Sequence, residues 1–106
     1  MKQDKVLSLI GLAQRAGKVA SGEFATERAV KKGDASVVFV AEDSSDNTKK
    51  MFNNMCTFYN VPIYIYSDKE SLGHAIGKEF RASLAVLDIG LKNAIDKNMN
   101  SMELMI

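Results

Sequence analysis

A polar, glycine-led segment runs from Ser21 to Gly33, with the sequence SGEFATERAVKKG. Its residue types predict a helix whose visible charges are mostly positive. Helix N-termini carry unpaired backbone N–H groups and a partial positive charge, so they attract anions such as phosphate. Arg28 lies two turns along this helix, and a guanidinium can donate two parallel hydrogen bonds to a phosphate or to a guanine edge. The segment is therefore a candidate contact for nucleic acid.

A second segment, Lys78-Glu79-Phe80-Arg81-Ala82, also mixes cations with an apolar ring and lies between an expected helix and an expected strand. The net charge is only +1, but residues 15–32 hold far more cations than acids, whereas residues 33–77 hold more acids than cations. A local excess of cations can bind nucleic acid on a nearly neutral protein. A solvated, charged helix would give the same pattern. The cations in question are Arg15, Lys18, Arg28, Lys31 and Lys32.

Residues that could support catalysis are few. The single histidine, His74, is interpreted as a partly exposed structural residue, and the single cysteine, Cys56, as a buried and inert thiol. Asp43 and Asp88 each follow an expected strand, where a cation could bind, but a role in the following turn or helix is the simpler interpretation. We therefore expect no enzyme, no metal and no cofactor.

Helical periodicities alternate with short apolar runs along the chain. The expected helices cover residues 4–16, 21–33, 46–59, 67–76 and 91–106, and the expected strands cover residues 19–20, 37–41, 63–66 and 84–87. The run at 37–41 is apolar at every position, which is typical of a strand covered on both faces. The alternation α-β-α-β-α-β-α-β-α predicts an α/β fold, a three-layer α/β/α sandwich around a mixed four-stranded sheet.

Several local features of these helices can also be predicted. Ser21 is expected to cap the second helix, and the spacing of Ser67 and Glu70 predicts a capping box before a short helix. Phe24 is expected to face the core with the alanines of the same helix, although an exposed Phe24 would be a candidate for stacking on a base. Two apolar stripes are predicted, one formed by Thr48, Met51, Phe52, Met55 and Tyr59, and one by Leu91, Ile95, Met99, Met102 and Ile106.

The composition, with 46% apolar and 25% charged residues in 106 positions, is that of one globular domain spanning residues 1–106 rather than of a disordered chain. No apolar run is long enough to cross a bilayer. The first residues, MKQDKVLSLIGLAQRAGK, do not resemble a signal peptide. With one cysteine, no internal disulfide is possible, and a reducing, cytoplasmic setting is expected.

The order and spacing of several motifs give the chain a family resemblance. They include SGEFATERAVKKGDASVVFVAEDSSDNTKK and NVPIYIYSDKESLGHAIGKEFRASLAVLD, which together with the opening GLAQRAGKVASGE span nearly the whole chain. The sequence resembles the kink-turn RNA-binding ribosomal proteins of the L7Ae/L30e superfamily, and among them the small bacterial members of the YlxQ type. This resemblance implies an α/β/α fold and two RNA contacts, at the start of the second helix and in the loop before the last strand.

The resemblance also assigns contacts to individual positions. In the family, a Gly-x-Asn-Glu-x-x-Lys pattern meets the sheared G·A pairs, and here it falls on Gly22, Glu23, Phe24, Ala25 and Arg28. The loop that covers a flipped-out nucleotide falls on Lys78, Glu79, Phe80, Arg81 and Ala82. Phe24 and Ala25 replace the Asn and Glu that read guanine edges, so we expect weaker or altered kink-turn selectivity, with phosphate contacts from Lys18, Arg28, Lys32 and Arg81.

These observations together predict a non-enzymatic RNA-binding protein of the translation apparatus that recognises a structured, bent RNA. Its expected partners are a structured RNA, which a ribosome could supply, and a ribosomal or other protein, with no membrane. Two alternatives stay open. One is a protein-interaction module of the same fold that has lost RNA specificity, and the other is a small enzyme that uses Asp43 or Asp88.

Overall fold

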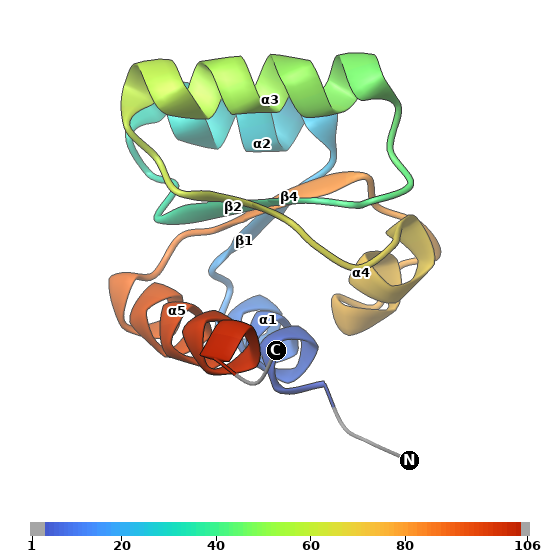
Figure 1. Cartoon of the computed structure of the whole chain (residues 1–106), viewed down its shortest axis with the longest axis vertical. Coiled ribbons are helices and arrows are strands. Elements are labelled where there is room, and N and C mark those ends of the chain that lie inside the picture. Colours follow the sequence, from blue (N-terminus) through green and yellow to red (C-terminus); the bar gives the residue numbers. More distant parts are fainter. Residues whose placement is uncertain (1–3, 105–106) are drawn as a thin grey trace.

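The computed structural model describes residues 4–104, with side chains described for residues 4–100. Within this range, five helices alternate with four strands (Figure 1). The helices are α1 (Lys5–Arg15), α2 (Glu23–Lys32), α3 (Asp46–Tyr59), α4 (Lys69–Ala75) and α5 (Ile89–Leu104). The strands are β1 (Val19–Ser21), β2 (Val37–Val40), β3 (Ile63–Ile65) and β4 (Ser83–Val86). None of the helices in this part of the chain is long and apolar enough to cross a membrane.

The strands form one mixed sheet in the order β1-β4-β2-β3. β4 is antiparallel to both of its neighbours, β1 and β2, whereas β2 and β3 are parallel. Figure 1 shows α2 and α3 on one side of the sheet and α1, α4 and α5 on the other. The predicted fold class, a three-layer α/β/α sandwich with a mixed four-stranded sheet, is therefore confirmed.

The two central strands, β2 and β4, supply side chains to both layers of helices. All residues of both strands are buried, as expected for strands covered on both faces. Successive side chains point to opposite faces of a strand, so Phe39 packs with α1, α4 and α5, while Val38 and Val40 pack with α2 and α3. On α3, Phe52 and Cys56 enter the second of these cores, whereas Tyr59, expected on the apolar stripe, is 41% exposed.

Two of the predicted N-caps differ from those in the structure. Gly22, and not Ser21, precedes α2, and its φ of 91° is a conformation that a side chain would strain. Ser21 is instead the last residue of β1, paired with Leu84. At α4, the carboxylate of Asp68 accepts a hydrogen bond from the Ser71 amide at 2.7 Å, so the predicted capping box of Ser67 and Glu70 is wrong by one residue.

The last helix, α5, begins two residues earlier than the apolar stripe predicts. Asp88 caps its first turn, because its carboxylate accepts a hydrogen bond from the Leu91 amide at 2.9 Å. Ile95 is buried in the core, and Leu91 and Met99 pack against it. The side chain of Met102, and all of Ile106, lie outside the described residues.

Candidate nucleic-acid interface

The two segments singled out in the sequence meet at one place on the molecule. The Gly22 amide donates a hydrogen bond to the Ser83 carbonyl at 2.9 Å. Next to it, Nε of Arg81 donates to Oγ of Ser21 at 3.3 Å, across 60 positions of sequence. The start of α2 and the loop between α4 and β4 (residues 76–82) therefore form a continuous surface, which we call the α2–loop surface.

The antiparallel pairing of β1 with β4 explains this proximity. Ser21, at the end of β1, pairs with Leu84, at the start of β4. The chain that leaves β1 and the chain that enters β4 must therefore lie at the same edge of the sheet. Because α2 follows β1 directly and the loop precedes β4 directly, sheet pairing alone brings the two segments together.

The loop between α4 and β4 is tied to its surroundings by backbone hydrogen bonds. The amides of Lys78 and Arg81 donate to the carbonyls of Gly73 and Lys69, at 2.8 and 2.9 Å. Gly73 has no side chain, and this allows the loop to lie directly on α4. A Cβ added there would lie 2.7 Å from the Glu79 carbonyl oxygen. The backbone of this loop is thus packed against α4.

Two side chains of this loop have the chemistry to contact RNA. The ring of Phe80 is 59% exposed. The guanidinium of Arg81 is positioned by Ser21 and by the carbonyl of Phe80, to which it donates at 2.7 Å. These two bonds use only part of the donors of a guanidinium, so Arg81 can still hold an anion. Lys78 and Glu79 are exposed beside them, and Ala82 is half-buried.

Phe24 lies on the surface, which corrects the prediction that it belongs to the core. Its ring is 76% exposed, whereas the buried residues of α2 are Thr26, Ala29 and Val30. Residues on one face of a helix are three or four positions apart, and Phe24 is only two positions before the buried Thr26. Phe24 therefore points away from the buried face of α2. Glu23 is exposed and Ala25 is half-buried on the same first turn.

The cations of α2 differ in their partners. Lys31 donates a hydrogen bond to Glu27 at 2.8 Å, which raises the pKa of Lys31, and Lys32 lies 3.7 Å from a carboxylate oxygen of Asp34. Arg28 is exposed and forms no ion pair among the described residues. It is therefore the cation of this helix most open to an external anion. Lys18 is also exposed, at the turn just before β1.

Beside Phe80 lies a hollow of about 490 Å³ with an acidic lining, formed by Asp43, Asp68, Lys69, Glu70 and Phe80. The carboxylate of Asp43 accepts a hydrogen bond from the Lys69 amide at 2.9 Å, so this residue joins the end of β2 to α4. The bond from the Ser71 amide lowers the pKa of Asp68. Because carboxylates repel phosphates, this side of Phe80 does not suit a nucleic-acid backbone, and the cationic side toward α2 does.

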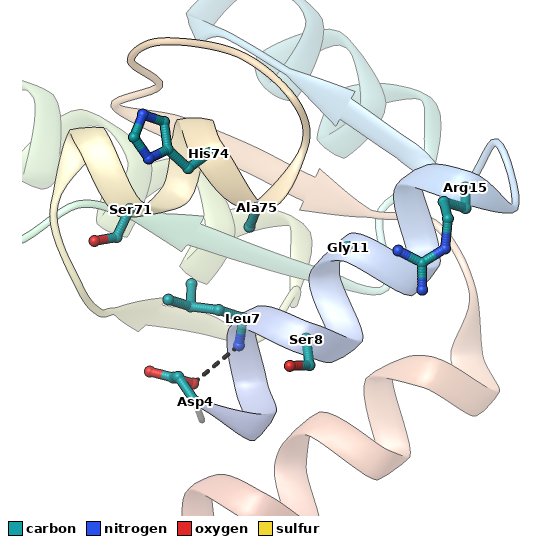
Figure 2. Close-up of a pocket in the computed structure, with 8 residues that line it drawn as sticks. All are labelled: Asp4, Leu7, Ser8, Gly11, Arg15, Ser71, His74 and Ala75. Atoms are coloured by element: carbon teal, nitrogen blue, oxygen red, sulfur yellow. Dashed lines mark hydrogen bonds between the residues drawn. The ribbon is translucent and has the colours of Figure 1, made fainter. Parts of the chain in front are cut away.

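A second hollow, of about 520 Å³, lies between α1 and α4 and contains none of the predicted contact residues. Figure 2 shows Arg15 and His74 at its two ends, with Gly11 between them on α1. The carboxylate of Asp4 on its rim already accepts hydrogen bonds from the Leu7 amide and the Tyr66 hydroxyl. His74 is exposed, as expected of a structural residue at the surface. Among the described residues, no three His, Cys, Asp or Glu side chains are grouped as a metal site.

Cys56 is buried between α3 and the sheet, and burial raises the pKa of its thiol from 9.0 to about 11. We expect iodoacetamide to label the folded protein far more slowly than the protein in denaturant, because only the thiolate is nucleophilic. Rapid labelling of the native protein, detected by mass spectrometry, would contradict the burial.

The raised pKa of Cys56 also predicts a change of stability with pH. The thiol ionises at lower pH in the unfolded protein than in the folded protein, so the free energy of unfolding should fall as the pH rises from 9.0 toward 11.

Sequence reasoning missed three contacts that build the α2–loop surface. They are the hydrogen bond from Arg81 to the Ser21 hydroxyl, the close approach of the loop to Gly73, and the hydrogen bond from the Gly22 amide to the Ser83 carbonyl. Neither bond across the surface could be inferred from spacing, because each joins residues far apart in the chain. Gly73 did leave a signal, since glycine is unfavourable inside a helix and its presence there indicates a close approach of other backbone.

Comparison with known proteins assigns the chain to a family. The sequence profile of the Ribosomal protein L7Ae/L30e/S12e/Gadd45 family matches residues 4–96. The RNA-binding protein YlxQ of Bacillus subtilis (strain 168) is 40% identical over 82% of this chain and 87% of the relative. The RNA-binding protein YlxQ of Enterococcus faecium is 38% identical over 83% and 84%. Both relatives are named as RNA-binding proteins, which agrees with the class of protein expected from the sequence.

Solved structures agree with this assignment. A Bacillus halodurans C protein of unknown function superposes with a TM-score of 0.88 and 33% identity, over 92% of this chain and 99% of that one. The Giardia lamblia 15.5kD RNA binding protein has a TM-score of 0.77 over 100% and 94% of the two chains, and at 18% identity this likeness shows a shared fold. The chain therefore belongs to the Ribosomal protein L7Ae/L30e/S12e/Gadd45 family, and its resemblance to the YlxQ type is confirmed.

Proposed function

We propose that this chain is an RNA-binding protein that recognises a bent, kink-turn-like RNA by its shape and its phosphates. The observation that carries the proposal is the α2–loop surface, where Gly22 binds Ser83 and Arg81 binds Ser21. These bonds join the two segments into one surface, on which Arg28, Lys78 and Phe80 are exposed. The names of the YlxQ relatives support the same class of ligand.

Binding on this surface combines charge with close approach. Arg28 and Arg81 neutralise phosphates on either side of Gly22, and Lys18, Lys32 and Lys78 add to the positive potential around them. Gly22 carries no side chain, so an RNA backbone can approach the amides of the first turn of α2. Phe80 and Ala82 pack against a base that the bend extrudes from the helix.

The first turn of α2 limits which bases this surface can read. Neither Phe24 nor Ala25 can hydrogen-bond a guanine edge, and a lost bidentate contact costs about 1–3 kcal/mol of discrimination. Glu23 is the one exposed side chain of this turn with a polar end, because Thr26 is buried. Selectivity for sheared G·A pairs is therefore weak, and the shape of the phosphate backbone determines more of the affinity.

A titration of the purified protein against two labelled RNAs tests this function. One RNA is a kink-turn, and the other has its sheared G·A pairs replaced by Watson–Crick pairs, so that it does not bend. Fluorescence anisotropy at two salt concentrations gives both affinities. The dependence of the affinity on salt gives the number of phosphates that the protein neutralises. We expect tighter binding to the kink-turn and a marked loss of affinity at higher salt.

The outcomes separate the parts of the proposal. Equal, salt-dependent binding to both RNAs would contradict recognition of the bend while leaving RNA binding in place. No binding to either RNA would contradict the function itself and favour a protein partner. We further propose that the RNA belongs to the translation apparatus, which a pull-down of RNA from cell extract followed by sequencing would test. We also propose that the protein acts in the cytoplasm, which cell fractionation followed by immunoblotting would test.

A further inference from the structure

The exposed face of α2 carries an aromatic ring and two cations at helical spacing. Phe24, Arg28 and Lys32 are each four residues apart, and all three are exposed. Residues at this spacing are neighbours on a helix surface. We call this row the α2 stripe. It begins beside Gly22 and runs away from the loop that contains Phe80.

Phe24 does not contribute to the packing of the protein. It belongs to neither hydrophobic cluster, and at 76% exposure it is one of the most exposed large apolar side chains of the described residues. Exposure of such a ring to water is unfavourable, so a ligand that covers the ring gains free energy of binding. The ring is also held on a fixed turn, because the Thr26 amide donates to the Gly22 carbonyl and the Gly22 amide to Ser83.

The neighbours of the ring indicate which ligand would cover it. An apolar protein surface would leave Arg28 without a partner and would desolvate it at a cost. An unpaired nucleotide satisfies both groups, since its base has a flat face for the ring and its phosphates pair with the guanidinium. Lys32, whose contact with Asp34 is long and exposed, can pair with the following phosphate.

We propose that the α2 stripe is a stacking site for an unpaired nucleotide, in which the base lies on Phe24 and its flanking phosphates contact Arg28 and Lys32. This inference rests on the proposed function and specifies its ligand as an RNA with at least one unpaired nucleotide beside the bend. Stacking is tolerant of base identity. Phe24 thus selects for an unpaired base by stacking, and no side-chain hydrogen bond reads the identity of the base at this position.

A double-mutant cycle, with one change in the protein and one in an RNA hairpin, tests the stacking. The hairpin carries a short unpaired bulge, and further versions have one abasic site, placed at each bulge position in turn, so that a single base is removed and all phosphates stay. The version used in the cycle is the one whose abasic site weakens binding by the parent protein but not by Phe24→Leu. Affinities are measured for the parent protein and for Phe24→Leu, which keeps an apolar side chain and removes the ring. We expect each change alone to weaken binding about tenfold, and both together no more than one of them.

A fluorescent base reports the contact directly. With 2-aminopurine placed at each bulge position in turn, the parent protein is expected to quench one position through Phe24, apart from any base that packs on Phe80. Phe24→Leu should remove the quenching at that position, and Phe24→Trp should restore it. Phe58→Leu is the matched control, because Phe58 is 80% exposed but lies on α3. It should leave affinity and quenching unchanged.

Three results would overturn the inference. The first is that Phe24→Leu binds the bulged hairpin as tightly as the parent, with the same quenching. The second is that Phe58→Leu weakens binding as much as Phe24→Leu does. Either would refute stacking on Phe24 while RNA binding stands. Absence of RNA binding by the parent protein, by contrast, would overturn this inference and the proposed function together.

Discussion

The variant Arg28→Glu is expected to bind the kink-turn RNA at least about tenfold more weakly than the parent protein, because one phosphate contact is lost and a repulsive charge takes its place. Arg28 is exposed and unpaired among the described residues, so its replacement breaks no internal ion pair. A glutamate at this position would also stand four residues before Lys32, which is a favourable arrangement on a helix. The melting temperature should therefore stay unchanged.

Two further variants make the Arg28 result specific. Lys5→Glu makes the same change of net charge on α1, on the other side of the sheet, and should alter the affinity little. Arg28→Gln should reduce the slope of log affinity against log salt by about one, as expected for a single phosphate contact. Equal affinities for the parent and Arg28→Glu, at equal melting temperatures, would remove Arg28 from the interface.

The variant Gly73→Ala is expected to lower both stability and RNA affinity. The new Cβ would lie 2.7 Å from the carbonyl oxygen of Glu79 and 2.8 Å from the amide nitrogen of Phe80, and backbone cannot rotate away as a side chain would. Overpacking of this kind costs about 1–3 kcal/mol. The displaced loop would carry Phe80 and Arg81 out of position. Urea unfolding measures the first effect, and the anisotropy titration measures the second.

Gly90→Ala is the matched control for this prediction. Both glycines lie in helices, where alanine is favoured over glycine by about 1 kcal/mol. At Gly90, however, the nearest atom to an added Cβ is the Asp88 carboxylate oxygen that caps α5, at 3.2 Å, and this side chain can shift by a few tenths of an ångström. We expect this variant to lose much less stability than Gly73→Ala, because even complete loss of an N-cap costs only about 1 kcal/mol. If Gly73→Ala behaved in the same way, the loop would not be packed on α4 as described.

Much of the fold could be predicted because the two central strands carry continuous apolar runs. The run at 37–41 and the run at 84–87 stand out from the helical periodicities around them, and both are strands covered on two faces. The strand order could not be predicted. The insertion of β4 between β1 and β2 depends on contacts between distant residues, and no local pattern encodes them.

The errors in the prediction arise where two residues of similar type compete for one role. Ser67 and Asp68 are both good N-caps. In the structure Asp68 caps α4, and Ser67 precedes it with a φ of 63°. Ser21 is a good N-cap as well, but its pairing with Leu84 places it in β1. Phe24 was misplaced because an aromatic ring next to alanines looks like part of an apolar face, and only the packed helix reveals which side is buried.

The candidate site was predicted as two separate segments, and its residues came from pattern and resemblance rather than from contact. The bond between Arg81 and Ser21 spans 60 positions and has no local signal. The contacts with RNA remain a prediction for every one of these residues. The exposure of Phe24 and the lack of an ion pair at Arg28 determine which of them to test first.

The position of β1 makes ligand binding and local stability interdependent. This strand has three residues, lies at the edge of the sheet and is paired with β4 on one side, so it is a place where the native structure can open without global unfolding. Opening would separate Gly22 from Ser83 and divide the α2–loop surface into halves. A ligand that contacts both halves binds the closed form alone and must therefore suppress the opening. Amide hydrogens of β1 should then exchange more slowly in the complex, which would report occupancy of the surface from residues that the ligand never touches.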